Sequence, residues 1–443
     1  MRKKAVQGFK DSEKLRIQFM LNNMNANKAY INTSYDIKKI KKDFYLKKLK
    51  EKYSNYRKNW VNNPKKSIKE KIYGEKFKAK KFIPLCVDIE IAAVCDLVCP
   101  FCFRQHIITP DKIMEEKLFY KIIDQCSDLG VPSIKLNWRG EPLLHPKLPE
   151  FIKYAKEKGI LEVIINTNAV TLDKKLSKRI IEAGLDFIIY SFDGGNKETY
   201  EKMRIGRFKQ NKFKDVYKNI VNFKKIKDTL NSKFPLTKIQ IILTKENFKI
   251  KSQFFKLFQN IIDDVSVKAY TERGGKLKDI DNELLKKIKK KLDKKIDERN
   301  IEHWKDINDN IYVSTKRLPC EQPFQRVLIT YDGVVSMCCY DWGSSHPIGY
   351  VHENAFKKNK KDYLDVQNKI KSKKKGFAKF MDKAIMPESF IKIPSKVETL
   401  YEIWHGKIIN DVRKEHINNN INNVEICKKC AFKETYKWEK LNI

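Results

Sequence analysis

The sequence contains no long hydrophobic run. No segment approaches the roughly 20 consecutive apolar residues of a membrane-spanning helix, so no stable membrane span is expected. Features of a signal peptide are lacking as well. Residues 1–4 are basic, but residues 5–25 mix charges and never form an apolar core. Both absences favour a cytoplasmic protein.

Arginine is scarce, although the formal net charge is +38. Only 13 arginines accompany 80 lysines. Stacking and bidentate contacts to nucleic acid favour arginine, and the interleaving of basic and aromatic residues that marks RNA-binding surfaces is not found. Lysine, asparagine and isoleucine are abundant together, which is typical of a biased genome composition. Nucleic acid is therefore not expected as a partner, whereas an acidic substrate, a phosphorylated carrier or an anionic membrane surface stays open.

The remaining composition is that of a folded protein. Of the 443 residues, 41% are hydrophobic and 11% aromatic, which suits one large catalytic domain and a smaller one. Ten cysteines in a reducing compartment argue for metal binding or catalysis rather than disulfides. Seven of them form an early group and a late group. Cys86, Cys126 and Cys339 are left over and are interpreted as packing residues.

From residue 82 onward, strands alternate with amphipathic helices. Such alternation implies parallel strands with right-handed crossovers. Six units are expected, and six suit an open barrel better than a complete eightfold one. The strands are predicted within residues 84–93, 133–138, 162–166, 186–192, 238–244 and 265–270, and a helix at 282–299 closes the sixth unit. We therefore predict an α/β fold, a partial (β/α)6 TIM-like barrel at residues 81–300.

The two flanking regions differ from this core. Residues 1–80 are rich in lysine, asparagine and tyrosine, and we expect a basic helical extension there. Residues 301–443 are predicted as a small C-terminal α+β domain. It contains a β-hairpin with an Asp-Gly turn at residues 326–337, a Lys-rich insertion at residues 353–398 and a helix at residues 400–416.

Polar and glycine-bearing segments follow the predicted strands. A cysteine-rich loop follows the first strand, Arg139-Gly140-Glu141-Pro142 the second and Thr167-Asn168 the third. Ser191 and Asp193 end the fourth strand, and Asn247 follows the fifth. Chemistry in such barrels belongs at the carboxyl ends of the strands, so these segments are expected on one face.

The first cysteine group, Cys95, Cys99 and Cys102, supplies three thiolates within eight residues. A cubane [4Fe–4S] cluster normally takes four cysteines, so three protein ligands leave one iron open, as in catalytic metal centres. A structural zinc site is the alternative. It needs a fourth nearby ligand, for which His106 is the only candidate, and the asymmetric spacing differs from paired CxxC arms.

This spacing, with Phe101 before the last cysteine, resembles the radical S-adenosylmethionine (SAM) superfamily. The resemblance covers about residues 82–273. It implies that the open iron of the cluster binds SAM and that an external reductant such as flavodoxin or ferredoxin supplies an electron. SAM is then cleaved to methionine and a 5′-deoxyadenosyl radical, which abstracts a hydrogen atom from substrate. The protein positions the reactants and excludes water, since the hard chemistry is the cofactor's.

Further motifs are similar to those of this superfamily. Gly140 and Glu141 stand in a Gly-Glu-Pro loop, where the resemblance implies close backbone approach to SAM and acceptance of a hydrogen bond from its ammonium group. Arg139 occupies the place where a second glycine often stands. A solvated loop carboxylate is the alternative for Glu141.

Other SAM contacts are carried over in the same way. Ser191 and Arg204, thirteen residues apart, resemble a pair that contacts the polar groups of SAM, and Arg204 is expected to neutralise its carboxylate. A surface arginine on a basic helix is the alternative. Phe101, Asn166 and Asn168 are weaker candidates for contact with SAM.

The second cysteine group resembles the auxiliary-cluster domain called SPASM, or its short form, twitch. Its matching features also include Asp332-Gly333, Trp404 and Arg413. The resemblance implies one auxiliary [4Fe–4S] cluster, with a structural zinc site as the alternative. Cys338 is preferred over Cys339, and the full set of expected ligands is Cys320, Cys338, Cys427 and Cys430.

The leading hypothesis is an oxidoreductase. Relatives with one auxiliary cluster include dehydrogenases of ring alcohols, so we expect two-electron oxidation of a hydroxylated small molecule or sugar. The alternatives are a peptide- or protein-modifying maturase and, further down, an RNA-modifying enzyme. The resemblance leaves the substrate, small molecule or peptide, unidentified.

Overall fold

The computed structural model describes most of the chain. The described residues are 44–107, 109–244, 247–269, 303–305, 311–344, 346–357, 396–428, 430 and 435–441. Three expectations lie wholly or largely outside them: the start of the N-terminal extension, the helix at 282–299, and the insertion at 353–398 apart from its ends.

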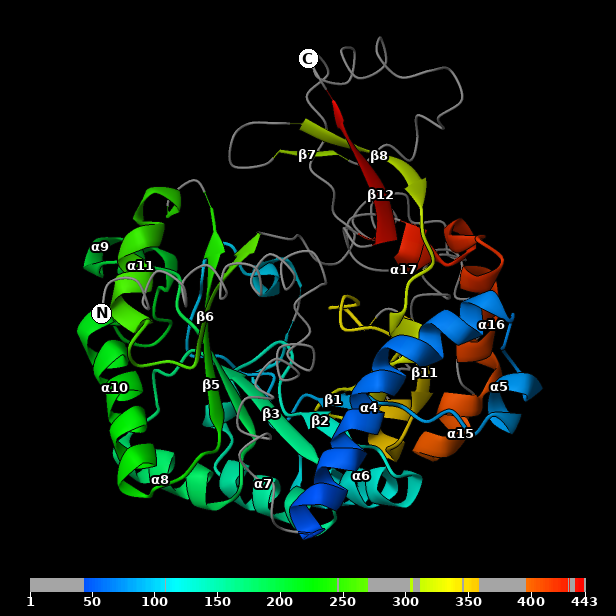
Figure 1. Ribbon diagram of the computed structural model, residues 1–443, viewed down its shortest axis with the longest axis horizontal. Helices are drawn as coiled ribbons and strands as arrows, with labels where there is room; N and C mark the ends of the chain where they lie inside the picture. Colours follow the sequence, from blue (N-terminus) through cyan, green and yellow to red (C-terminus); the bar gives the residue numbers. More distant parts are fainter. Residues whose placement is uncertain are drawn as a thin grey trace.

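Six parallel strands follow one another in chain order across one sheet. They are β1 (Cys86–Ile89), β2 (Ser133–Lys135), β3 (Glu162–Thr167), β4 (Phe187–Ser191), β5 (Leu236–Leu243) and β6 (Asp264–Ala269). The sheet curves without closing, because β6 stands at its edge (Figure 1). The predicted partial barrel is thus confirmed.

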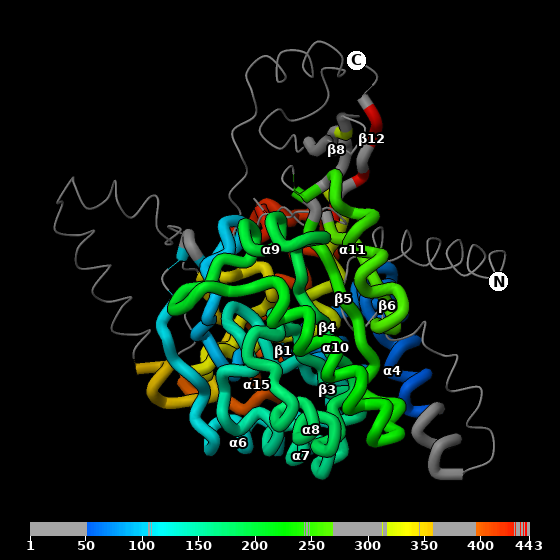
Figure 2. Tube along the Cα trace, turned by 90° about the vertical axis from the view of Figure 1, so that its left-hand side faces the viewer, coloured from blue at the N-terminus to red at the C-terminus, as the bar shows by residue number. Residues whose placement is uncertain are grey.

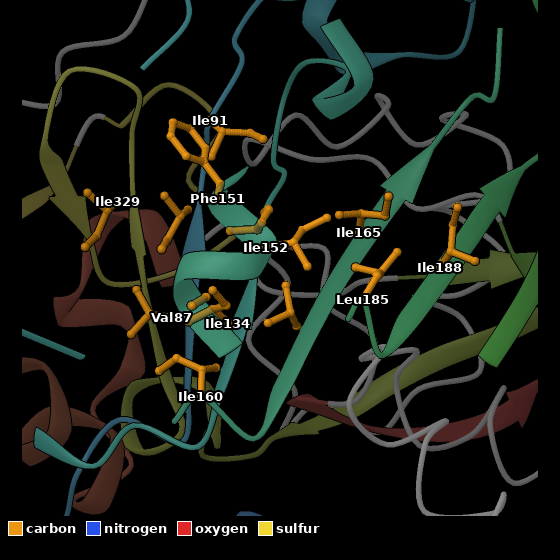
Figure 3. Close-up of a cluster of buried hydrophobic side chains, with 14 of the residues drawn as sticks. Val87, Ile91, Ile134, Phe151, Ile152, Ile160, Ile165, Leu185, Ile188 and Ile329 are labelled. Carbon is orange, nitrogen blue, oxygen red and sulfur yellow. The ribbon is translucent and has the colours of Figure 1, made fainter. Parts of the chain in front are cut away.

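Helices cover the outer face of this sheet. They carry apolar residues on one side only, at helical spacing, and that side packs against the strands. Figures 1 and 2 show them in a layer around the curved sheet, and Figure 3 shows the side chains between the layers, such as Phe151 and Ile152 against Ile134 and Ile165. The layer contains α6 (Glu116–Leu129), α7 (Leu148–Glu157), α8 (Lys174–Glu182), α10 (Phe213–Thr229) and α11 (Lys251–Phe258).

One helix of the N-terminal extension closes the inner face of the barrel. Helix α4 (Phe44–Lys69) buries Tyr53, Tyr56 and Trp60. These aromatic rings join an apolar cluster with side chains from the amino-terminal halves of the strands, among them Cys86 and Phe187. The helix therefore forms the floor of the barrel interior.

The predicted C-terminal hairpin is present and continues the barrel sheet. Strand β9 (Arg326–Ile329) pairs in parallel with β1, and β10 (Val334–Ser336) and β11 (Pro347–Tyr350) follow antiparallel. The cysteine-bearing segments of the second half are thereby fixed to the strand that leads into the first cysteine loop.

The expected helix at residues 400–416 is two helices, α15 (Leu400–His405) and α16 (Lys407–Ile417). Gly406 between them is extended, and a Cβ there would lie 2.8 Å from the carbonyl oxygen of Glu402. Glycine also has low helix propensity, which explains the break.

A smaller antiparallel sheet stands above the barrel (Figure 1). It consists of β7 (His303–Lys305), β8 (Ile311–Arg317) and β12 (Tyr436–Leu441). None of the described helices has the length and apolar character needed to cross a membrane.

Candidate functional site

The loop after β1 carries Cys95, Cys99 and Cys102. Its backbone is held against the segment that follows α9 (Lys197–Met203), because Val98 donates to the carbonyl of Ile205 at 2.8 Å. A tight turn brings the last two cysteines together, with the amide of Cys102 donating to the carbonyl of Cys99. The three thiols thus lie at the carboxyl end of the first strand, as the sequence predicts.

The thiols of Cys95 and Cys99 on this loop are desolvated. None of the ten cysteines forms a disulfide. Burial raises the pKa of the Cys95 thiol, and it raises that of Cys99 to about 11 although Arg204 opposes it. A bound metal favours the thiolate instead. Two thiols that the protein alone would keep neutral, with the third cysteine on the same loop, suit a bound iron cluster.

The loop after β2 passes directly behind the cysteine loop. A Cβ at residue 140 would lie 2.3 Å from the carbonyl oxygen of Ala92 and 2.4 Å from that of Val94. A glycine is therefore required at residue 140 because the backbone of the cysteine loop lies so close. The sequence suggests a different reason, the close approach of SAM.

Glu141 is buried within a set of hydrogen-bond donors. Its Oε1 accepts from the hydroxyl of Thr167 at 2.7 Å and from the amide of Leu143 at 3.1 Å, and its Oε2 accepts from the amide of Asn168 at 2.7 Å. Burial, with Asp96 adding to it, raises the pKa of this carboxyl to about 8. A cationic group placed beside it restores the ionised form.

Asn168 links three segments of the site. Its side-chain amide donates to Asp96 of the cysteine loop at 2.7 Å, and its oxygen accepts from the amide of Val170. The side chain that was a candidate for SAM contact is therefore engaged in holding the cysteine loop beside Glu141.

Arg204 lies inside the site rather than on the surface. It forms a buried ion pair with Asp193 and reaches Cys99 Sγ at 3.8 Å, with its guanidinium 5.5 Å from the centre of the Phe101 ring. Ser191 is half-buried at the end of β4. The structure brings both predicted polar contacts and Phe101 to the carboxyl edge of the sheet.

Arg139, on the loop after β2, joins the end of β1 to the second half of the chain. It forms a bidentate pair with Glu90, both distances being 2.7 Å, and donates to the carbonyl of Trp342 at 3.1 Å. Both side chains are buried. The motif marked this position only as a departure from glycine, and Glu90 carries no sequence signal beyond being a charge next to a buried strand.

Cys320, Cys338, Cys427 and Cys430 gather at the base of the small upper sheet. The pKa of the Cys427 thiol is raised by burial and by Cys430 and Cys320. Arg317 on β8 holds the CxxC segment by donating to the carbonyl of Cys427 at 2.7 Å. The structure thus brings together the four predicted auxiliary ligands.

Neighbouring Cys338 and Cys339 have different surroundings. The pKa of Cys338 is raised by a hydrogen bond with Cys339, by burial, and by Cys320 and Cys430. Cys339 lies beside Arg326, whose Nη1 is 3.8 Å from its sulfur. Cys338 therefore lies close to Cys320 and Cys430, while Cys339 contacts Arg326.

Within the described part of the chain, no three His, Cys, Asp or Glu side chains are gathered as ligands of a single metal ion. In a four-iron cluster each cysteine binds a different iron, so the ligands stand farther apart than those of one ion.

Two tryptophans connect the cysteine groups. Trp138 donates from Nε1 to the carbonyl of Cys339 at 2.9 Å, and its ring centre is 6.4 Å from that of Trp342. Trp342 in turn contacts Phe103, next to Cys102, with ring centres 6.1 Å apart. These residues and Leu328 form one apolar cluster. No motif in the sequence points to this cluster.

The inner face of the barrel is polar above the α4 floor. Strand registers place Asn166, Ile189, Lys238 and Asp264 in one layer, where Lys238 pairs with Asp264. The next layer towards the cysteine loop contains Ser191, Gln240 and Ser266. In the Asn166 side chain, Oδ1 is buried without a hydrogen-bond partner among the described residues.

Comparison with known proteins agrees with this geometry. Residues 89–238 match the model of the radical SAM superfamily, and residues 320–376 match SPASM, an iron-sulfur cluster-binding domain. The chain contains a radical SAM domain followed by a SPASM domain. The first of these domains binds a [4Fe–4S] cluster with SAM, and the second indicates an auxiliary iron–sulfur cluster.

Curated relatives match only part of this radical SAM chain. GTP 3′,8-cyclase of Chlorobaculum tepidum is 36% identical over 126 residues, which are 28% of this chain and 38% of the relative. The tungsten-containing aldehyde ferredoxin oxidoreductase cofactor-modifying protein of Pyrococcus furiosus is 26% identical over 176 residues, 39% and 48% respectively. The chain therefore spans less than half of the length of either relative.

Two solved structures illustrate the similarity. BtrN in complex with AdoMet and 2-DOIA is 16% identical with a TM-score of 0.41, covering 81% of this chain and 99% of BtrN. Streptococcus suis SuiB bound to precursor peptide SuiA is 18% identical with a TM-score of 0.43, covering 61% and 63%.

Proposed function

We propose that this radical SAM enzyme carries out the two-electron oxidation of a hydroxylated small molecule, such as a sugar or cyclitol alcohol, to a ketone. Its substrate binds within the barrel, between the first cysteine loop and the α4 floor. When bound, the SAM cluster supplies hydrogen-atom abstraction, and the auxiliary cluster supplies an acceptor for one electron.

The observation that carries this proposal is the polar inner face. Asn166 offers a buried oxygen without a partner among the described residues, and a substrate hydroxyl satisfies it by donating a hydrogen bond. Ser191 and Gln240 belong to the adjoining layer. Amide and hydroxyl groups of this kind fix the orientation of a polyol in a pocket.

The arrangement of the two cysteine groups supports oxidation rather than a redox-neutral reaction. Trp138 and Trp342 pack between them, and the hydrogen bond from Trp138 to the carbonyl of Cys339 fixes this contact. Four cysteines in the auxiliary group leave no iron open for substrate. The proposed role of that group is therefore electron transfer.

The first test follows hydrogen transfer from candidate alcohols. Ring alcohols deuterated at the carbinol carbon are incubated with the reconstituted enzyme and SAM, and deuterium in 5′-deoxyadenosine is measured by mass spectrometry. We expect transfer from a polyol. Transfer only from a peptide substrate would replace this proposal with the maturase alternative.

Asn166→Ala tests the binding role of the inner face. We expect kcat/KM for the alcohol to fall at least tenfold, because a hydroxyl partner worth about 1.4 kcal/mol or more is lost. Substrate-independent cleavage of SAM should continue at the rate of the parent enzyme. A loss of both activities would assign Asn166 to SAM binding instead.

Cys427→Ala combined with Cys430→Ala tests the redox role. The first cysteine group lies on another loop, so cleavage of SAM to 5′-deoxyadenosine should survive while formation of the ketone collapses. Product at the parental rate would mean that the auxiliary group is structural. Far-UV circular dichroism shows whether the variant is folded, since metal-nucleated regions can unfold without their metal.

A further inference from the structure

Exposed hydrophobic side chains concentrate around the first cysteine loop. Single exposed apolar residues are ordinary on protein surfaces, but groups of them mark interaction sites. Among the described residues, four of the six large exposed hydrophobic side chains belong to the cysteine loop or to segments bonded to it. These four, which we call the loop-side patch, are Val98, Ile113, Ile205 and Phe208, whereas Phe234 and Tyr401 lie elsewhere.

Backbone pairing joins the segments that carry this patch. Leu97 and Gly206 form an antiparallel bridge, and the amide of Arg207 donates to the carbonyl of Asp96 at 2.8 Å. Ile113 pairs with Ala92 at the start of the cysteine loop. The patch is therefore part of the scaffold that shapes the loop, and Phe208, 70% exposed, is its most prominent side chain.

Basic groups accompany the apolar ones. The guanidinium of Arg207 lies 4.9 Å from the centre of the Phe208 ring. Arg104 and Arg207 both pair with Asp111, so one carboxylate balances two guanidinium groups. Lys112 and Lys209 are exposed next to the patch residues. The charge of this surface is positive, in keeping with the net charge of +38.

We infer that the loop-side patch docks a small acidic electron-transfer protein that reduces the first cluster. Val98 is adjacent in sequence to Cys99, so a carrier seated on the patch brings its redox centre next to the cysteine loop. Acidic carriers complement the basic rim, which speeds encounter by electrostatic steering. In the transfer the carrier loses one electron and the cluster gains it, and no covalent bond changes.

The experiment uses reduced flavodoxin as the acidic carrier and dithionite as a reductant that needs no docking surface. Phe208→Asp and Lys209→Glu are compared with Tyr401→Asp, which adds a charge at an exposed aromatic position on α15, across the molecule from α9 (Figure 1). The rate of cluster reduction is followed anaerobically by stopped-flow absorbance, and flavodoxin binding is measured by titration of the metal-free protein.

We expect both patch variants to slow reduction by flavodoxin at least about tenfold, equivalent to about 1.4 kcal/mol, and to weaken flavodoxin binding. Reduction by dithionite and the behaviour of Tyr401→Asp should match the parent. The parental rate should also fall with salt, and less so in Lys209→Glu.

Unchanged rates and affinities with flavodoxin in both patch variants would overturn the inference. An equal loss with dithionite would overturn it too, because the substitutions would then have damaged the cluster site rather than a docking surface. The inference rests on the cluster at Cys95, Cys99 and Cys102 and is independent of the substrate, so failure of the proposed alcohol oxidation leaves these readouts unaffected.

Discussion

Arg139 stands where the motif resemblance leads one to expect a glycine, and its side chain makes contacts that a glycine could not make. The guanidinium lies over the Trp138 ring, 4.2 Å from its centre, while its nitrogens bind Glu90 and the carbonyl of Trp342. One side chain thus ties the Gly-Glu-Pro loop to β1 and to the second half of the chain.

Arg139→Ala should destabilise the metal-free protein by about 3 to 5 kcal/mol, because Glu90 is left as a buried unpaired charge. Denaturant unfolding measures the change. Glu90→Gln in the same chain should recover part of the loss, and Arg179→Ala, which removes a half-exposed partner of Glu150, serves as the matched control. A loss below about 1 kcal/mol for Arg139→Ala would show that the pair does not hold these loops together.

Glu162, at the floor of the barrel, makes the free energy of unfolding depend on pH. Burial raises its pKa to about 7, although Arg57 opposes the shift and Tyr56 donates to its Oε2 at 3.0 Å. Below pH 4.5 both the folded and the unfolded chain hold the proton. Between pH 4.5 and 7 only the folded chain keeps it, so stability falls as the pH rises through this window and is level above it.

Between pH 4.5 and 7 the free energy of unfolding should fall by about 3 kcal/mol, at roughly 1.4 kcal/mol per pKa unit. Glu162→Gln should remove that part of the pH dependence, whereas Glu157→Gln, at an exposed position on α7, should not. Unfolding free energies of the metal-free protein at pH 5, 6, 7 and 8 measure it. Parallel pH curves for Glu162→Gln and the parent would contradict the prediction.

At the scale of elements, alternating strands and helices could be predicted because hydrophobic periodicity is a local property. The meeting of the polar segments after β1 to β4 at one edge could be predicted too, because the carboxyl ends of parallel strands point in the same direction. The parallel pairing of β1 with β9 could not be predicted in this way. It joins Val87 to Val327 across most of the chain, and neither strand carries a mark of its partner.

The α4 floor was likewise beyond the sequence pattern. Residues 1–80 show only loose helical periodicity. The burial of Tyr53, Tyr56 and Trp60 depends on the strands against which they pack, and these strands are distant in sequence. The same holds for Trp138 and Trp342, whose contact depends on the tertiary fold.

Trp60→Ala should destabilise the metal-free protein by about 3 to 5 kcal/mol through loss of a fully buried ring and the cavity left behind. Lys58→Ala, at an exposed position of the same helix, should change stability by less than about 0.5 kcal/mol. Thermal and denaturant unfolding measure both. Similar small effects of the two substitutions would mean that α4 only rests on the barrel.

For the whole molecule, two clusters per chain are expected. The anaerobically reconstituted protein should contain about eight irons, four in each cubane. Replacing Cys95, Cys99 and Cys102 by alanine should leave about four irons and abolish cleavage of SAM. Iron and zinc analysis together with Mössbauer spectroscopy measures this. About four irons in the parent protein, with zinc making up the rest, would contradict the auxiliary cluster.

The pairing of β1 with β9 also has a consequence for the order of events during synthesis. β1 leaves the ribosome well over 200 residues before β9 exists to cover its edge. At roughly 5 to 20 residues per second, that edge waits for roughly 10 to 50 seconds. An uncovered strand edge is a template for wrong pairing, so the nascent barrel is most exposed to misassociation, and most in need of a chaperone, beside its first cysteines.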